Sequence, residues 1–171
     1  PLARPRGADT VPAMRWLVLL VLVCGAAWWW YGEPDYGGFG SLSPHRHAPD
    51  PPVQEALETP RVVRKGDYTI HLTHRFALRA LVLSAKTYSL DRESALAPVD
   101  LALGWGKMSN PAPLRMLEIP QRGRFYRWRY ENRPPMPEHE ITASSANMHM
   151  SPADREVERA LRQLRRGDVI E

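Results

Sequence analysis

The stretch that decides the fold of this chain is YTIHLTHRFALRALVL, residues 68–83. In its first half the apolar residues Tyr68, Ile70 and Leu72 alternate with polar ones, and a period of two is typical of a β-strand. In its second half, residues 76–83, apolar side chains occupy both faces, which predicts a strand buried on both sides. The stretch therefore predicts a β domain with its core here.

Further strand candidates are residues 87–90, 114–119, 124–130, 140–143 and 168–171. Within the third of these, Tyr126, Trp128 and Tyr130 share one face, as alternate residues of a strand do. Together the candidates predict an α+β domain dominated by a strongly bent, mainly antiparallel sheet. A small barrel of the OB or SH3 type is the form that we expect for it.

One amphipathic helix is expected near the C-terminus, over residues 152–165. Ser151 can cap its start, Pro152 suits the first helical position, and Asp154 stands where a capping box places an acid. The apolar stripe of this helix consists of Val157, Ala160, Leu161 and Leu164. Spacings of three and four residues place a stripe on one side of a helix, so we expect that side to pack against the sheet.

Glycine, proline and serine dominate residues 32–60, which show no apolar period. Such a stretch cannot bury enough surface to offset the entropy lost on ordering, so we expect a linker. The exported β-rich domain then covers residues 61–171. Residues 168–171 start a strand that stops at once, so we expect a chain cut short at its C-terminus.

An apolar run without any charge, WLVLLVLVCGAAWWWY, occupies residues 16–31. It is near the short limit for a membrane-spanning helix, which needs about 20 apolar residues. The aromatic cluster of residues 28–31 is typical of the membrane–water interface. Arg4, Arg6 and Arg15 precede the run, and the positive-inside rule places such residues in the cytoplasm. We therefore expect a single-pass bacterial inner-membrane protein with a cytoplasmic tail, residues 1–15, and a periplasmic domain.

Three alternatives for the apolar run remain open. Gly25, Ala26 and Ala27 have the small side chains of a cleavage site, so the run could be a cleaved secretory signal. It could also be a buried core helix. A lipid anchor on Cys24 fits poorly, because Val23 is bulkier than the residue expected there. Both the anchor and the signal export the rest of the chain.

The N-terminal tail carries a separate question about the start of translation. Met14 and Arg15 together would make an ordinary start for an exported protein, and residue 1 is a proline. We therefore expect residues 1–13 to be an upstream extension.

Composition narrows the class of protein. The single cysteine lies in the apolar run, so the exported part has no disulfide and depends on a hydrophobic core. Residues 60–171 carry a net charge of +6 and residues 1–59 a net charge of −2. The basic excess suits anionic inner-membrane lipid or a polyanionic envelope polymer, and the alternative is ordinary surface charge. Nucleic acid is a poor partner for an exported domain.

Two tryptophans are candidate ligand-binding residues. Trp105 stands between Gly104 and Gly106 and could serve as a stacking platform for a sugar or a base. It could equally fill the core beneath a tight turn. Trp128 lies among arginines and aromatic residues within residues 124–130.

The polar segment of residues 141–150 supplies the other candidate site residues. Ser145, Asn147 and His149 could bind a ligand, and Ser145 with His149 and Asp100 could form a hydrolase site. No glycine-flanked nucleophile turn surrounds the serine. The alternative is that these side chains satisfy the backbone of a buried loop.

His139 and His149, with Asp100 or Glu140, are the residues that could form a metal site. Their spacing matches neither a helical histidine pair nor a compact zinc pattern. We therefore expect no metal and no cofactor.

The motifs APVDLALGWGKMS (residues 97–109), RFYRWR (124–129), SSANMHMSPAD (144–154) and RRGDVIE (165–171) resemble those of an uncharacterised family of bacterial proteins. Members of that family have one N-terminal membrane anchor and no established activity. The resemblance covers residues 65–171 and implies a compartment and a domain extent, not a reaction. The relatives have histidine where this chain has Ala143, and they continue beyond the equivalent of Glu171 into a strand.

These observations lead to three hypotheses for function. The first is a non-catalytic binding or assembly module of the cell envelope, tethered to inner-membrane lipid and contacting an envelope protein. The second is an envelope hydrolase that uses Ser145 and His149. The third is a metal-dependent nuclease on a barrel fold.

Overall fold

The computed structural model describes Val21, Phe39 and residues 47–171. The chain divides into two units, Pro1–Asp35 and Tyr36–Glu171. The expected membrane span and most of the expected linker therefore lie outside the described residues, except that Val21 is helical. None of the helices in the described part of the chain has the length and apolar character needed to cross a membrane.

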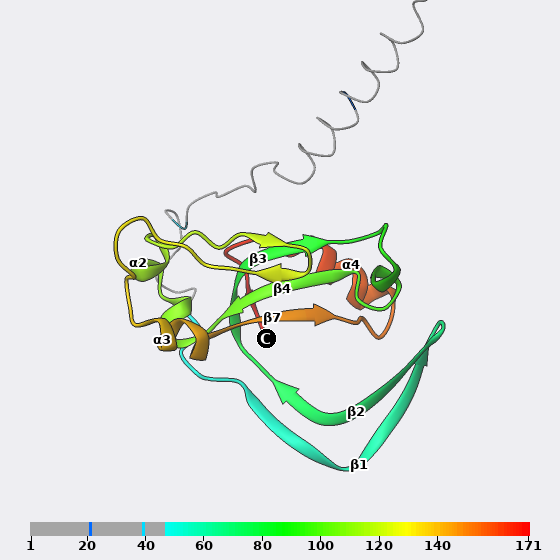
Figure 1. The fold of residues 1–171 in the computed structure, drawn as a ribbon. Coiled ribbons are helices and arrows are strands. Elements are labelled where there is room, and N and C mark those ends of the chain that lie inside the picture. The colour runs from blue at the N-terminus through cyan, green and yellow to red at the C-terminus, as the bar shows by residue number, and fades with distance from the viewer. Residues whose placement is uncertain (1–20, 22–38, 40–46) are drawn as a thin grey trace, which may run out of the picture. The chain divides into compact units, whose positions relative to one another are not determined.

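The described part of the second unit is mainly β-structure with short helices (Figure 1). Its strands are β1 Val53–Lys65, β2 Tyr68–Ala77, β3 Ala80–Thr87, β4 Val99–Gly104, β5 Gln121–Arg122, β6 Phe125–Tyr126, β7 Ser145–Met150 and β8 Val169–Ile170. Its helices are the 3-10 turns η2 Arg92–Ala95 and η3 Gly106–Ser109 and the α-helices α2 Pro111–Leu114, α3 Glu138–Ala143 and α4 Arg155–Gln163. All pairings between these strands are antiparallel, so the expected α+β class is confirmed.

The strands form three separate sheets within the described residues. Four of them make a central sheet in the order β7-β4-β3-β8, while β1 pairs only with β2 and β5 only with β6. The expected OB- or SH3-like barrel is therefore not closed in this part of the chain. Residues 78 and 79 separate the exposed strand β2 from the buried strand β3. The sequence pattern had predicted one continuous strand here.

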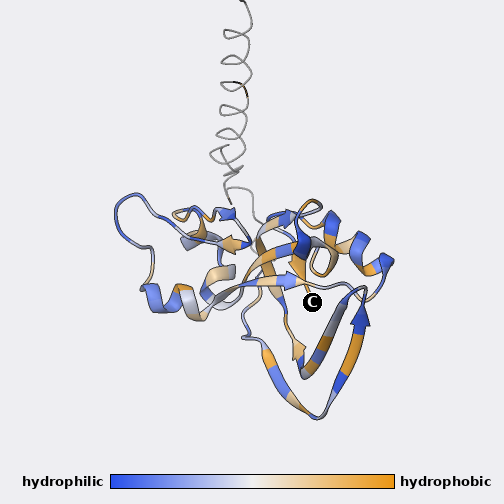
Figure 2. Ribbon diagram, turned by 45° about the vertical axis from the view of Figure 1, so that its right-hand side comes forward, coloured by the Kyte–Doolittle hydropathy of each residue, from blue (hydrophilic) through white to orange (hydrophobic). Residues whose placement is uncertain are grey.

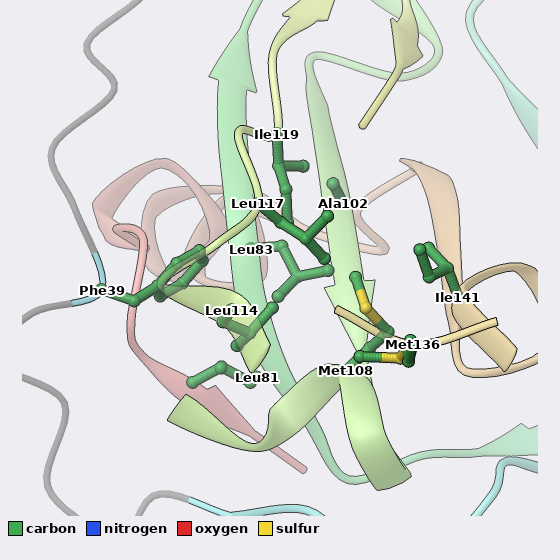
Figure 3. Close-up of a cluster of buried hydrophobic side chains, with 10 residues drawn as sticks. All are labelled: Phe39, Leu81, Leu83, Ala102, Met108, Leu114, Leu117, Ile119, Met136 and Ile141. Atoms are coloured by element: carbon green, nitrogen blue, oxygen red, sulfur yellow. The ribbon is translucent and has the colours of Figure 1, made fainter. Parts of the chain in front are cut away.

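Strand β4 and the first half of β3 are buried on both faces of the central sheet. On one face Leu81, Leu83 and Ala102 join a core cluster that reaches Met108 and Ile141 (Figure 3). The segment from α2 to β6 covers this face. Tyr126, Trp128 and Tyr130 pack against the same cluster, and their alternation had grouped them on one side.

Gly104 ends β4 where the chain folds tightly onto η3. A Cβ added at Gly104 would collide with the backbone oxygen of Met108. Glycine is therefore required at this position by close approach of the backbone. Ala48 is tied to the same turn, because its N–H donates to Ser109 Oγ and its carbonyl accepts from the same hydroxyl, both at 3.0 Å. Residues 47–49, expected to be linker, thus pack onto the domain.

Helix α4 covers the other face of the sheet. Leu161 and Leu164 pack against the cluster that includes Val82 and Leu101. The helix begins later than the sequence suggested, because the Asp154 carboxylate accepts from the backbone N–H groups of residues 156 and 157 at 2.9 Å. Ser151 is therefore not the cap.

Two other elements differ from expectation. Residues 140–143, a strand candidate, lie in α3, and the expected polar loop after them is strand β7. Within residues 114–119 and 124–130, extended pairing is limited to β6 and to one bridge between Glu118 and Arg129. Pro120 lies between the Glu118–Arg129 bridge and β5 and cannot donate to a ladder.

The hairpin β1–β2 is the most exposed element. Its middle stands away from the central sheet, and its tip returns to the body of the unit (Figures 1 and 2). The strands are joined at Gly66 and Asp67; of the two, only Gly66 has positive φ, 55°, which is the pattern of a type II′ hairpin turn. β1 begins at Val53, so part of the expected linker is in fact strand.

Candidate functional site

β7 places three of the predicted site residues on one face of the central sheet. Ser145, Asn147 and His149 alternate along the strand, so their side chains point to the same side. Across the β4–β7 ladder, His149 lies opposite Asp100 and Ser145 opposite Gly104. The sequence predicted these residues as a group but placed them in a loop.

His149 and Asp100 form the centre of this polar face. The His149 ring nitrogen Nδ1 lies 2.8 Å from Asp100 Oδ1. The Asp100 side chain is fully buried, whereas the His149 side chain is 47% exposed. A buried carboxylate therefore orients a ring whose other side reaches solvent, which is the arrangement of an oriented general base.

Arg124 is the second partner of Asp100. Its Nη1 donates to Asp100 Oδ1 at 3.3 Å and to the Ala97 carbonyl at 3.0 Å, while Nε and Nη2 donate to the Asp91 carboxylate at 2.9 and 2.7 Å. The guanidinium also lies 4.2 Å from the centre of the Tyr88 ring. These contacts use its donors inside the protein, so Arg124 holds the site together and is poorly placed to bind a substrate anion.

Three pKa values are shifted at this cluster. The hydrogen bonds to Asp91 raise the pKa of the Arg124 guanidinium, and in return those bonds lower the pKa of Asp91. Burial raises the pKa of the Tyr88 hydroxyl. The shifts favour the charged forms of Arg124 and Asp91 and the neutral form of the Tyr88 hydroxyl.

Arg124 also adopts a backbone conformation that is uncommon for its residue type. Gly123 and Arg124 have φ of 55° and 65° and form the turn between β5 and β6. A left-handed conformation costs a non-glycine residue about 1–2 kcal/mol. The ion pairs of the side chain offset this cost, so the turn and the polar cluster stabilise each other.

Asn147 is hydrogen-bonded to the turn between β5 and β6. Its Nδ2 donates to the Arg124 carbonyl at 2.8 Å, and its Oδ1 accepts from Gln121 Nε2 at 2.9 Å. Two buried acceptor atoms at the cluster, Asp100 Oδ2 and Gln121 Oε1, have no hydrogen-bond partner within the described part of the chain. Asn147 therefore has a structural role between β7 and β5–β6.

Ser145 has partners of its own. Its hydroxyl donates to the Ile141 carbonyl at 2.6 Å and lies 3.0 Å from the Tyr126 hydroxyl. Four residues along a strand separate it from His149 by about 13 Å. The structure brings His149 to Asp100 but does not bring Ser145 to either.

The two predicted tryptophans differ in position. Trp105 is buried, with 9% of its surface exposed, and therefore presents no open stacking platform. Trp128 is half-buried against the core and stacks on Tyr130, with ring centres 6.2 Å apart and planes 15° from parallel. Both side chains contribute to packing.

The candidate metal ligands are dispersed. His139 is exposed on α3, and Glu140 forms an ion pair with Lys107. No group of three or more histidine, cysteine, aspartate or glutamate side chains in the described residues is arranged to hold a metal ion.

Comparison with protein families, with curated proteins and with solved structures gives no match for this chain. Function is therefore inferred from the chain's own geometry.

A hollow of about 700 Å³ lies between α2 and the loop after Tyr130. Leu114, Met116, Tyr130 and Arg133 line it, together with Phe39. The chain neighbours of Phe39 lie outside the described residues, and we assign no ligand to this hollow.

The hairpin carries a surface that the sequence did not predict. Tyr68, Ile70, Leu72, His74 and Phe76 alternate along β2, and Val63 and Arg61 lie opposite Ile70 and Leu72 on β1, so these residues share one face. We call the five apolar ones, Tyr68, Ile70, Leu72, Phe76 and Val63, the arch face. The exposed fractions of Val63, Leu72 and Phe76 are 42%, 39% and 46%. The alternation is visible in the sequence, but there it predicts one side of a buried sheet.

Two residues at the hairpin tip orient the arch face. Lys65 Nζ donates to the carbonyls of Leu96 and Pro152 at 3.1 and 2.8 Å, and Tyr68 Oη donates to the Arg92 carbonyl at 2.9 Å. Lys65 lies opposite Tyr68 on the same face of the hairpin. The arch face is therefore turned toward the body of the unit, while its middle remains accessible to solvent.

Proposed function

We propose that this protein is a membrane-tethered binding or assembly module of the bacterial cell envelope, which holds a segment of another envelope protein on the arch face. The observation that carries the proposal is the exposure of Val63, Leu72 and Phe76 on the arch face of a hairpin that pairs with no other strand among the described residues. His74 lies between Leu72 and Phe76, and Val53 and Val62 are exposed on the opposite face. Exposed apolar groups rimmed by polar residues are typical of interaction sites.

The energetics of the hairpin favour this role. A two-stranded hairpin without a covered face is at best marginally stable in water. Full burial of one large apolar side chain contributes about 1.5–3 kcal/mol. A partner that covers Leu72, Phe76 and Val63 would therefore stabilise both the hairpin and the complex.

The tether and the compartment are proposed from the sequence. The uncharged apolar run of residues 16–31 suits a single span of the inner membrane, with the N-terminus in the cytoplasm and the domain in the periplasm. The net charge of +6 on residues 60–171 would hold the domain near anionic headgroups. A reporter enzyme joined after Glu171 should be active only on the periplasmic side. Activity on the cytosolic side would overturn the topology.

The experiment that tests the binding role compares two neighbouring residues on opposite faces of β2. In Leu72→Gln the arch face loses an apolar side chain, whereas the matched control His71→Gln changes the other face. Full-length protein is crosslinked in intact membranes, and the partner recovered with it is quantified. We expect Leu72→Gln to lower the recovery about tenfold and His71→Gln to leave it unchanged. Equal recovery with both variants would overturn the proposal.

A second candidate function is hydrolysis, favoured by the hydrogen bond between Asp100 and His149. In that proposal His149 acts as the general base and Asp100 orients its ring. Ser145 would have to leave the Ile141 carbonyl to take part, so a hydrolase here would be more sensitive to His149→Gln than to Ser145→Ala. Equal loss of a measured activity in both variants would instead support Ser145 as the nucleophile.

A further inference from the structure

We infer that the partner segment held by the arch face is an extended strand, which pairs with the free edge of β7 and alternates apolar with small polar residues. This inference rests on the proposed binding function and adds the binding mode and the chemistry of the segment. Strand addition gives affinity through main-chain hydrogen bonds and specificity through alternate side chains.

β7 is an edge strand of the central sheet. Among the described residues it pairs only with β4, so its other edge has no neighbouring strand. The strands behind it, β4 and β3, carry the buried clusters of the unit, which hold β7 in place before a partner arrives. A row of unpaired N–H and C=O groups along such an edge is a template for a further strand.

One hydrogen bond shows which backbone groups of β7 face the free edge. The Trp105 N–H donates to the Ser144 carbonyl at 2.9 Å, so these two residues continue the β4–β7 ladder as a hydrogen-bonded pair. Hydrogen-bonded pairs alternate with non-bonded ones along an antiparallel ladder. Asn147 and His149 therefore stand in non-bonded pairs, and their N–H and C=O groups point to the free edge. These groups have no hydrogen-bond partner in the part of the chain that the structure describes.

The hairpin stands beside this edge. Lys65, at the hairpin tip, donates to the carbonyl of Pro152 at 2.8 Å, two residues after β7 ends. At the other end of the hairpin, Leu78 follows β2 and packs against the same buried cluster as Met148 and Met150 of β7. Both views place the arch on the β7 side of the central sheet (Figures 1 and 2). A strand along the free edge of β7 would therefore lie between β7 and the hairpin, where it can also contact the arch face.

The side chains of β7 specify the composition of the added strand. Directly opposite residues of neighbouring strands share a face, so alternate residues of the added strand would lie beside the half-buried Met148 and Met150. That neighbourhood calls for apolar side chains. The residues between them would lie beside His149, whose ring is already paired with the buried carboxylate of Asp100. Small uncharged polar side chains, such as serine, fit there without adding a charge that needs its own counter-ion.

A second copy of this chain is a poorer occupant of the edge. Two β7 strands could pair with their polar faces matched and their apolar faces matched. Each copy, however, carries its own hairpin on that side of the central sheet (Figures 1 and 2). Two whole domains would then compete for the space beside β7, whereas a single extended segment brings no hairpin of its own.

Residue-resolved amide hydrogen exchange of the full chain in mild detergent tests the edge directly. The probe is an eight-residue peptide of alternating valine and serine, and the control is a peptide of the same composition in two blocks. We expect the Asn147 and His149 amides to exchange fast in the free protein and at least about tenfold more slowly with the alternating peptide. The Met148 amide, bonded to β4, should be slow in both states. Equal effects of the two peptides, no protection, or protection in the free protein would overturn the inference.

A proline at position 149 tests one outward-facing donor. His149→Pro removes the N–H that points to the free edge but takes no hydrogen bond from the β4–β7 ladder, and proline is tolerated on edge strands at such positions. The matched control, His149→Ala, loses the same imidazole and keeps the N–H. With a fluorescent form of the alternating peptide, we expect His149→Pro to bind at least about tenfold more weakly than His149→Ala. Equal affinities would contradict strand addition at this edge.

Two further outcomes separate this inference from the proposed function. If the alternating peptide leaves the edge amides unprotected but Leu72→Gln still lowers partner recovery from membranes, strand addition is wrong and the binding role stands. If both experiments are negative, both proposals fail. Concentration-dependent dimerisation that protects the Asn147 and His149 amides without peptide would show a second copy as the occupant and overturn the inference.

Discussion

The Nδ1 atom of His149 lies 2.8 Å from Oδ1 of Asp100, and the two residues are direct neighbours across the β4–β7 ladder. The same carboxylate oxygen accepts a hydrogen bond from Arg124, whose side chain is 10% exposed. A fully buried carboxylate is tolerated because two basic side chains converge on it. The polar cluster thereby links the central sheet to the β5–β6 turn.

Replacement of Asp100 by asparagine should destabilise the domain strongly. It removes the buried negative charge that faces Arg124 and His149 and keeps only a neutral amide oxygen as acceptor, and breaking a buried ion pair costs about 3 kcal/mol. The matched control is Asp91→Asn, which changes an exposed partner of the same guanidinium and should cost less. Urea unfolding of both variants measures the difference. Equal midpoints would show that Asp100 is not the central partner.

Gly104→Ala should also destabilise the domain, through a steric conflict. The added methyl group would collide with the Met108 backbone oxygen, so β4 or η3 must shift, at a cost of about 1–3 kcal/mol. Gly66→Ala is the control, because nothing lies within 4 Å of its added Cβ and only the positive φ opposes it. Thermal unfolding should rank Gly104→Ala as the more damaging change, and the reverse order would contradict the packing at η3.

The N-cap of α4 can be identified by substitution. Asp154→Ala removes an acceptor for two backbone N–H groups and should cost about 1 kcal/mol of unfolding free energy. Ser151→Ala loses only a 3.4 Å contact with Lys65 at the surface and should be nearly neutral. A larger effect of the serine substitution would restore the helix start suggested by the sequence.

The ion pair between Asp91 and Arg124 predicts a dependence of stability on low pH. Hydrogen bonds from Arg124 lower the pKa of Asp91 in the folded protein. The contribution of this ion pair to the free energy of unfolding is therefore complete above the ordinary aspartate pKa of about 3.9. It is lost as the pH falls through the lowered pKa that Asp91 has in the folded protein. Asp91→Asn should flatten this part of the acid unfolding curve. An unchanged curve in the variant would show that other carboxylates govern acid unfolding.

Local patterns in the sequence predicted two of the four strands of the central sheet, β3 and β8, but not β4 or β7. The alternation in residues 124–130 correctly grouped Tyr126, Trp128 and Tyr130 on one side, and β8 was found at its expected position. Of the predicted stripe on the C-terminal helix, Leu161 and Leu164 pack against the core, with Leu164 just past the helix end, whereas Val157 and Ala160 are exposed. The features predicted correctly depend on residues close in sequence, which is why the pattern sufficed.

Long-range contacts explain what the sequence did not predict. Residues 145–150 are polar enough to suggest a loop, but pairing with the fully buried strand β4 makes them a strand. The Ser145 hydroxyl donates to the Ile141 carbonyl rather than facing a ligand, and Trp105 is buried by parts of the chain distant from it. The pairing of β1 with β2 was missed because proline at positions 51, 52 and 60 suggested a linker.

The most direct test of the binding role is site-specific photocrosslinking in living cells. A photoreactive phenylalanine analogue replaces either Leu72, on the arch face, or His71, on the opposite face, in the full-length protein. We predict one discrete crosslinked partner from position 72 and none, or far less, from position 71. The same crosslinks from both positions, or none from position 72, would contradict the proposal that the arch face holds a partner.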